Sequence, residues 1–187
     1  MTQRADIPLG NCLKTLISAE RIQARIREMA AQISRDYAGQ QLHLICILKG
    51  ASMFLADLLR YLELDVSIDF IALSSYKKGT TTTGEVQLTK DLDFPLDGRD
   101  VLIVEDILDT GLTLNYLYHL LLSRSPRSLK IVTLLDKPSR RIQPVSVDYV
   151  GFEIPDAFVV GYGLDYGERY RQLPEVCVLE TSEGVLK

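Results

Sequence analysis

Two adjacent acids, Glu105 and Asp106, open the stretch of the chain that is best equipped for chemistry. The four apolar residues before them, 101–104, are typical of a short strand buried on both faces of a parallel sheet. The acids would then lie at the carboxyl edge of an open α/β sheet, where ligands usually bind. Their carboxylates suit the hydroxyls of a sugar, or a divalent cation that prefers oxygen ligands.

A loop of small and polar residues follows the acids and leads into a helix: Asp109, Thr110, Gly111, Leu112 and Thr113. A helix N-terminus presents unpaired N–H groups and the positive end of the helix dipole, so this loop can bind a phosphate. Neither the GxxxxGK[ST] pattern of a nucleotide P-loop nor the GxGxxG pattern of a dinucleotide fold occurs here. The alternative is that Asp109 or Thr110 only caps the helix.

Two more candidate strands end in basic residues that would face the same edge of the sheet. The apolar run 42–48 ends at Lys49 and Gly50, and the run 129–135 ends just before Lys137. A plain strand-to-helix turn, with glycine supplying backbone freedom, is the alternative at Lys49.

A polar segment, residues 74–84, separates candidate strands at 66–73 and 85–92. It holds Ser75 and Tyr76, two lysines and four consecutive threonines. Long loops without regular structure are uncommon in compact domains and often act as lids or binding loops. We therefore expect an unstructured, mobile lid, with a disordered hairpin tip as the alternative.

The composition is that of a globular protein. The 187 residues suffice for one well-cored domain, and 47% hydrophobic and 25% charged residues are ordinary values. The net charge of -4 offers no electrostatic footprint for nucleic acid. No apolar run is long enough to cross a membrane, and the N-terminus lacks the apolar core of a signal peptide. We expect a cytoplasmic protein that binds neither nucleic acid nor membrane.

The cysteines and histidines lack metal-site spacing. Cys12, Cys46 and Cys177 are odd in number and lie mostly in apolar surroundings, which favours reduced core residues. His43 lies in a strand-like run and His119 in a helix-like run, so both are expected to be structural.

Helix and strand patterns alternate along most of the chain. Apolar residues keep helical spacing over 18–37 and 52–62, and further strands are expected at 147–154 and 175–180. This alternation predicts an α/β fold with a doubly wound, mainly parallel sheet flanked by helices.

The thirteen residues 101–113 resemble the phosphoribosyl-diphosphate motif of the type I phosphoribosyltransferases. Other segments extend the resemblance, over about residues 42–179, to the hypoxanthine-guanine members of that family. The matching segments are residues 48–50, 75–76, 134–138 and, most specifically, 151–166.

The resemblance implies the type I phosphoribosyltransferase fold in a single domain, residues 1–187. Its core would span about residues 40–140. A small hood would be formed by terminal segments, about residues 1–15 and 141–187, and a mobile lid loop would complete the site.

The resemblance also implies the donor, 5-phospho-α-D-ribosyl 1-diphosphate (PRPP), bound with Mg²⁺. Glu105 and Asp106 would hold the ribose hydroxyls, directly or through the metal. The loop from Asp109 through Thr110, Gly111 and Leu112 to Thr113 would hold the 5′-phosphate. Leu112 departs from family members that carry Lys there. Because backbone amides need no such side chain, we expect only a modest effect on phosphate affinity.

The implied acceptor is a free 6-oxopurine, hypoxanthine or guanine. Asp109 would be the catalytic residue, taking the purine N7 proton as N9 attacks ribose C1. Lys137 would donate to the purine O6, Phe158 would stack on the ring and Val159 would contribute its backbone. Asp165 would border the purine site and bind a second Mg²⁺ near the diphosphate.

The diphosphate would lie against Lys49, Gly50 and Arg171, under a lid that carries Ser75 and Tyr76. Closure of the lid would exclude water and prevent hydrolysis of the donor. Family members often hold the peptide bond before Lys49 in the cis form.

Two other functions stay open. A phosphoribosyltransferase fold can serve as a ligand-sensing transcriptional or RNA-binding regulator, but the negative net charge and the presence of Asp109, Lys137 and Asp165 favour the enzyme. A xanthine- or guanine-preferring relative is the closer rival. The resemblance further suggests a homodimer or homotetramer, with Lys49 near a subunit interface.

Overall fold

The computed structural model describes residues 12–78, 81–181 and 184–185, and its centre is a six-stranded sheet. The strand order is β4-β3-β2-β5-β6-β7, and all neighbours are parallel except the β3–β4 pair. The bounds are β2 Gln41–Leu48, β3 Asp65–Lys78, β4 Thr81–Lys90, β5 Asp100–Leu108, β6 Ser128–Asp136 and β7 Tyr149–Glu153. The predicted mainly parallel sheet is confirmed.

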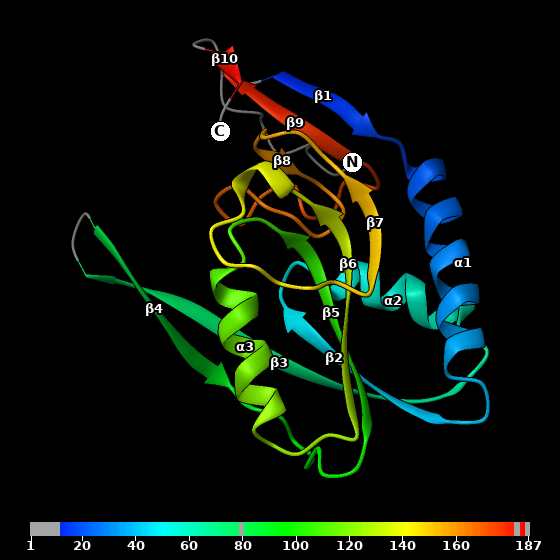
Figure 1. The fold of residues 1–187 in the computed structure, drawn as a ribbon. Coiled ribbons are helices and arrows are strands. Elements are labelled where there is room, and N and C mark those ends of the chain that lie inside the picture. The colour runs from blue at the N-terminus through cyan, green and yellow to red at the C-terminus, as the bar shows by residue number, and fades with distance from the viewer. Residues whose placement is uncertain (1–11, 79–80, 182–183, 186–187) are drawn as a thin grey trace, which may run out of the picture.

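Helices cover both faces of this sheet (Figure 1). They are α1 Ala19–Asp36, α2 Ser52–Tyr61 and α3 Leu112–Leu122, with a short 3-10 turn at Pro138–Arg140. The apolar sides of α1 and α2 join one buried cluster, and that of α3 joins the other. The Ser18 hydroxyl caps α1 by accepting from the Arg21 N–H at 3.4 Å. None of the described helices has the length and apolar character needed to span a membrane.

The central strands are apolar on both faces because a helix layer covers each face. In β5, Leu102 and Val104 belong to the cluster under α1 and α2, whereas Val101 and Ile103 belong to the cluster under α3. Successive side chains of a strand point to opposite faces, so a continuous apolar run is required here.

Strand β5 is longer than its apolar run. It continues to Leu108, so Glu105 and Asp106 lie within the strand and not beyond it. Pairing with β6 explains the extension, because Glu105 is still opposite Thr133 and Ile107 is opposite Leu135. The acids nevertheless lie toward the carboxyl edge of the sheet.

A second, smaller sheet lies at the carboxyl edge of the first (Figure 1). It consists of β1 Cys12–Ile17, β8 Val159–Val160, β9 Val176–Thr181 and β10 Gly184–Val185. Its strands come from both ends of the described chain. However, β7 pairs with β6 in the large sheet, and the apolar side of α1 packs in the same buried cluster as Tyr149 of β7. Residues 19–36 and 149–153 therefore pack with the large sheet.

Residues 74–84 were expected to form an unstructured loop, and this prediction is wrong for the part of the segment that the structure describes. Strand β3 continues to Lys78, β4 begins at Thr81, and the two pair antiparallel as a long hairpin (Figure 1). Threonine is β-branched and favours strands, so a polar threonine run can extend a hairpin without packing into a core. Ser75 and Tyr76 lie on β3, but their side chains are outside the described part of the structure.

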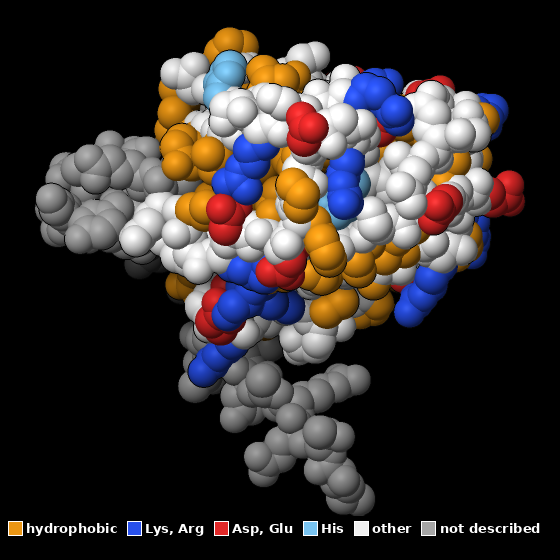
Figure 2. Space-filling model, turned by 90° about the horizontal axis from the view of Figure 1, so that it is seen from below, with side chains coloured by type: hydrophobic (Ala, Val, Ile, Leu, Met, Phe, Trp, Pro, Cys, Tyr) orange, Lys and Arg blue, Asp and Glu red, His pale blue; other side chains and the backbone are white. Residues whose placement is uncertain are grey.

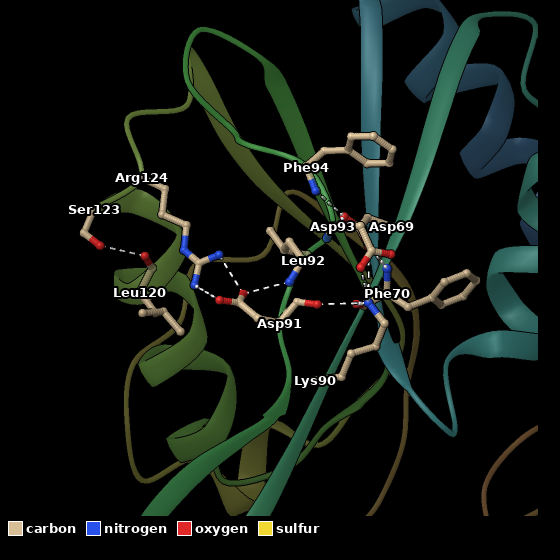
Figure 3. Close-up of polar contacts among 10 residues, drawn as sticks. All are labelled: Asp69, Phe70, Lys90, Asp91, Leu92, Asp93, Phe94, Leu120, Ser123 and Arg124. Carbon is tan, nitrogen blue, oxygen red and sulfur yellow. Dashed lines mark hydrogen bonds and ion pairs between the residues drawn. The ribbon is translucent and has the colours of Figure 1, made fainter.

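A polar cluster fixes the base of this hairpin (Figure 3). The buried Asp69 carboxylate accepts from the N–H groups of Asp93 at 2.7 Å and Phe94 at 3.2 Å. Asp91 pairs with both terminal nitrogens of Arg124, at 2.7 and 3.0 Å, just after α3. The cluster ties the end of β4 to β3 and to α3.

Candidate active site

The acids of β5 lie in surroundings that disfavour their charged forms. Both Glu105 and Asp106 are half-buried. Burial raises the pKa of Glu105 well above its ordinary value, and the neighbouring Asp106 charge raises it further. Burial also raises the pKa of Asp106. Two carboxylates in such surroundings are suited to a cation or to hydroxyl donors.

Close backbone contact brings three distant segments together beside Asp106. A Cβ on Gly50 would overlap the Asp106 carboxylate, and a Cβ on Gly163 would overlap the Gly50 carbonyl. Gly163 also has a φ of +96°, where other residues are strained. Position 163 therefore requires glycine, and a side chain at position 50 would displace the Asp106 carboxylate. The peptide bond between Leu48 and Lys49, just before this contact, is cis.

The loop after β5 has the form of an anion site. Gly111 is the N-cap of α3, with φ 83°, and it has no side chain to occupy the free helical N–H groups. The loop borders a cavity of about 200 Å³. Its lining includes Glu105, Asp109, Thr110, Gly111 and Thr113. The N–H groups at the start of α3 are thus available to a phosphate at this cavity.

Asp109 contacts basic side chains and does not act as the N-cap of α3. Its carboxylate lies 3.3 Å from Arg140 Nε and 3.9 Å from Lys137 Nζ. Lys137 is only 5% exposed, whereas the Asp109 side chain is 40% exposed. The pairing places a half-exposed carboxylate beside a buried ammonium group at the mouth of the loop. Thr110 Oγ1 is 3.5 Å from the Leu112 N–H, at the limit of a hydrogen bond.

The segment after Lys137 stabilises the loop at residues 109–113 through hydrogen bonds that the sequence did not predict. Arg141 donates to the Asp109 carbonyl at 2.9 Å, and the N–H groups of Ile142 and Gln143 donate to the Thr110 carbonyl at 2.9 and 3.0 Å. A Cβ on Gly111 would in turn overlap the Gln143 carbonyl. The only signal in the sequence was the run of basic residues after β6.

A second ion-pair group lies beside Gly163. Arg171 donates to the Gly163 carbonyl at 2.7 Å and pairs with Asp165 at 2.8 Å and Glu168 at 3.1 Å. Glu168 also pairs with Lys49 at 2.9 Å. Sequence reasoning placed Lys49 and Arg171 at one site but missed Glu168, the acid that joins them.

The expected purine residues lie on and after β8. Phe158 packs edge-on against Tyr166, with ring centroids 5.7 Å apart at 84°. Val159 is buried in β8 opposite Val178 of β9. Asp165 follows shortly afterwards and belongs to the Arg171 group.

The structure therefore arranges the expected residues in two sets. One set joins the phosphate loop to Lys137 through Asp109. The other joins Asp106 to Arg171 and Lys49 through Gly50 and Gly163. The placement of the Ser75 and Tyr76 side chains over either set lies outside the described residues.

The carboxylates suit Mg²⁺ only as partial ligands. Among the described residues, no three His, Cys, Asp or Glu side chains are grouped closely enough to hold a metal ion. Mg²⁺ commonly takes one or two carboxylates and fills its octahedron with phosphate oxygens and water. The half-buried pair Glu105 and Asp106 fits that pattern. Asp165 fits less readily, because one oxygen faces Arg171 and the other accepts from the Glu168 N–H at 2.8 Å.

Comparisons with known proteins agree with this geometry. A family model described as a phosphoribosyl transferase domain matches residues 14–167. The chain is 52% identical to the hypoxanthine-guanine phosphoribosyltransferase of Bacillus subtilis, covering 89% of this chain and 93% of the relative. It is 49% identical to that of Mycobacterium tuberculosis, covering 95% and 91%.

A solved structure shares the fold. The hypoxanthine-guanine phosphoribosyltransferase of Bacillus anthracis aligns with a TM-score of 0.84 at 49% identity, covering 88% of this chain and 97% of the other. The family match spans the whole large sheet and the loop after β5, but it ends before β9 of the small sheet. The chain belongs to the phosphoribosyltransferase family, among its hypoxanthine-guanine members.

Proposed function

We propose that this protein is a purine-salvage enzyme that transfers the 5-phosphoribosyl group of PRPP to N9 of hypoxanthine or guanine. The products are the purine nucleoside 5′-monophosphate and diphosphate. The observation that carries the proposal is the buried Lys137 ammonium, 3.9 Å from Asp109 beside a helix N-terminus that has no side-chain cap. That arrangement supports the proposal because it brings a cation, a carboxylate and helix N–H groups close together, and the reaction needs one group of each kind.

In this proposal the donor is held along the β5 edge. Its 5′-phosphate accepts hydrogen bonds from the first N–H groups of α3 and from the hydroxyls of Thr110 and Thr113. Glu105 and Asp106 face the ribose hydroxyls, and their raised pKa values favour partners that donate protons or bring positive charge. Mg²⁺, when bound there with the diphosphate, would supply charge neutralisation.

Bond exchange takes place at ribose C1. The bond from C1 to the diphosphate oxygen breaks as the bond from C1 to purine N9 forms, and positive charge develops on the ribose in between. The acids of β5 stabilise that charge. Asp109 takes the N7 proton and, held by Arg140, keeps the purine in the reactive tautomer and orientation.

Lys137 is the proposed discriminator between 6-oxo and 6-amino purines. Its ammonium group donates to the O6 of hypoxanthine or guanine, but it would face another donor in adenine. Burial makes that mismatch costly, because an unpaired buried donor loses its hydration. Phe158 stacks on the base, and backbone groups near Val159 complete the pocket.

The diphosphate is proposed to displace existing ion pairs. Lys49 and Arg171 are each paired with Glu168 in the structure. Lys49 and Arg171 would turn toward the diphosphate, which would also accept a hydrogen bond from the Gly50 N–H. Arg171 would then no longer pair with Asp165, and Asp165 would be free to bind a second Mg²⁺. The β3–β4 hairpin carrying Ser75 and Tyr76 would then close over the diphosphate and exclude water.

Steady-state rates with hypoxanthine, guanine, xanthine and adenine, each at saturating PRPP and Mg²⁺, test the proposal. We expect turnover with hypoxanthine and guanine and little with adenine. Preferential use of xanthine would instead identify the xanthine-preferring rival. No turnover with any purine would reject the enzyme and favour a regulator that only binds the donor.

Two broader expectations are also proposals. Cys46 and Cys177 are free and buried, which agrees with a cytoplasmic location. A homodimer or homotetramer with Lys49 near an interface would be measured by light scattering of the full chain.

A further inference from the structure

Tyr162 lies in a turn where its backbone conformation favours glycine. It is flanked by Gly161 and Gly163, and the three residues have φ values of 95°, 50° and 96° along the chain. For a bulky residue a positive φ costs free energy, so it persists only where surrounding contacts hold it. A tyrosine at the centre of this turn therefore indicates that its side chain makes a contact that glycine could not make.

The side chain of Tyr162 makes a buried hydrogen bond to helix α2. The residue is only 6% exposed, and its hydroxyl donates to Asp57 Oδ2 at 2.6 Å. Burial raises the pKa of Tyr162, and the Asp57 carboxylate raises it further, so the hydroxyl keeps its proton and remains the donor. Asp57 also accepts from Gln23 of α1 at 2.5 Å and from Arg60 at 2.9 Å. The bond therefore fastens the turn to two helices.

This bond connects the two segments that supply the proposed diphosphate-binding cations. Lys49 and Gly50 lie shortly before α2, on the side of Asp57. Arg171 lies after the turn, and its guanidinium donates to the Gly163 carbonyl at 2.7 Å. Gly163 in turn packs so closely on Gly50 that an added Cβ would overlap the Gly50 carbonyl. One cation is thus fixed to α2 and the other to the turn.

A direct ion pair between the same two segments holds them less firmly. Lys49 and Glu168 pair at 2.9 Å, but their side chains are 68% and 64% exposed. Exposed ion pairs contribute little to stability, whereas a buried hydrogen bond to a charged group contributes more. The bond from Tyr162 to Asp57 is therefore the stronger constraint on the distance between the two cations.

The spacing of nearby cations matters because the chain as a whole does not attract anions. Its net charge is -4. On the face shown in Figure 2, the amino edge of the large sheet, Lys and Arg side chains lie among Asp and Glu side chains. A diphosphate is strongly anionic, and attraction between charges falls with their separation. In the proposed function it would therefore depend on cations placed close to it, such as Lys49 and Arg171.

We propose that Tyr162 is a positioning residue for the diphosphate of PRPP. Through its hydrogen bond to Asp57 it sets the distance between Lys49 and Arg171, and it acts through these cations, not by contact with the substrate. The inference rests on the proposed function, in which the two cations bind the diphosphate. Loss of the Tyr162 hydroxyl should weaken binding of a ligand that carries a diphosphate and spare a ligand that does not.

Two ligands that share the 5-phosphoribosyl group test the proposal. PRPP carries the diphosphate, whereas inosine 5′-monophosphate, the expected product from hypoxanthine, carries a base in its place. The dissociation constants of both are measured by calorimetry on the full chain with Mg²⁺. In Tyr162→Phe the constant for PRPP should rise about tenfold, because small displacements of a charged binding group are costly. The constant for the monophosphate should not change.

Tyr149→Phe is the matched control. Tyr149 is also buried, at 4% exposed, and its hydroxyl also donates to a carboxylate, that of Asp36, at 2.8 Å. It lies on β7, outside the turn that carries Gly163. Urea unfolding should show that both variants are less stable than wild type, whereas only Tyr162→Phe should change the affinity for PRPP.

Asp57→Asn tests the same bond with a milder change, and it serves if Tyr162→Phe does not fold. Asparagine keeps an acceptor for the Tyr162 hydroxyl, so the constant for PRPP should rise by a smaller factor. The double variant should be little worse than Tyr162→Phe, because both changes act through one contact. Additive losses would mean that Tyr162 acts through another contact and would overturn the proposal.

The binding and turnover results separate failure of this inference from failure of the proposed function. Unchanged affinity for PRPP in Tyr162→Phe, or an equal loss of affinity for both ligands, would overturn the positioning role while wild-type turnover still supports the transferase. A wild-type chain that turns over no purine would reject the proposed function and this inference with it.

Discussion

The two ends of β5 carry carboxylates in opposite electrostatic situations. At the amino end, Asp100 is buried and accepts from Arg127 and from the Ser128 hydroxyl at 2.7 Å. The Arg127 guanidinium holds the pKa of Asp100 below its ordinary value. At the carboxyl end, burial raises the pKa values of Glu105 and Asp106, and neither has a cation in hydrogen-bond contact among the described residues.

We interpret the difference as one between a residue that stabilises the fold, Asp100, and residues proposed to bind a ligand, Glu105 and Asp106. A carboxylate with a lowered pKa contributes free energy to folding at neutral pH, whereas one with a raised pKa costs free energy there. Asp100 at the amino end of β5 therefore stabilises the folded protein. The charges of Glu105 and Asp106 at the carboxyl end lower its stability, and a bound substrate or metal would reduce that cost. Functional sites commonly carry such a cost.

The largest expected effect is on turnover at the carboxyl end. Asp109→Asn should lower kcat about 100-fold or more, because loss of a general base typically costs 10²–10⁴. The KM for PRPP should change little, since the amides of the loop remain. Asp156→Asn is the matched control, because Asp156 also faces Arg140, at 3.8 Å, but is not part of the loop. Equal losses in the two variants would remove the role assigned to Asp109.

The next effect is on purine preference. Lys137→Ser should lower the ratio of kcat/KM for hypoxanthine over adenine by at least about tenfold, since the mismatched buried donor is gone. Arg140→Gln serves as control, because it removes a cation beside Asp109 without removing the O6 donor. It should lower both rates and preserve the ratio. A ratio that is unchanged in Lys137→Ser would mean that another group reads O6.

Periodicity was sufficient to predict the framework of the site. The apolar runs of β2, β5 and β6 and the helical spacing of α1 and α3 reflect burial between layers, which is a local pattern in the chain. The acids and the loop after them were located from the point where the apolar run of β5 ends. These elements were predicted because each depends on neighbouring residues.

Contacts between distant residues were not predictable in the same way. The pair Lys49 and Glu168 is 119 positions apart, and the bracing of Thr110 by Gln143 depends on how the turn after β6 folds back. The extension of β3 and β4 into residues 74–84 was missed, because the threonine run there has strand propensity but no apolar alternation. Strand β1 was missed because it is defined by pairing with β9 at the other end of the chain.

The amino end of β5 offers the complementary test, on stability. Asp100→Asn should lower the free energy of unfolding by about 2 kcal/mol, from the loss of charge-assisted hydrogen bonds to a buried acceptor, without changing kcat. Because the folded pKa is lowered, the contribution of Asp100 is present above its ordinary pKa of 3.8 and is lost as the pH falls through the folded value. Urea unfolding at pH 7 and pH 3 measures both. The exposed Asp93→Asn should stay within about 0.5 kcal/mol of wild type.

The smallest effect, and the sharpest test of the comparison, is a gain in stability at the carboxyl end. Glu105→Gln removes a charge that burial and Asp106 disfavour. The free energy of unfolding, measured without substrate at pH 7, should therefore rise by about 1 kcal/mol. The same substitution should lower kcat. Because the folded pKa of Glu105 is raised, wild-type stability should decline as pH rises from its ordinary pKa of 4.5 toward the folded value, and the variant should lack that decline. Glu28→Gln, an exposed acid paired with Arg25, controls for loss of a negative charge. If Glu105→Gln is no more stable than wild type, the carboxyl end does not carry the electrostatic cost that distinguishes it from Asp100.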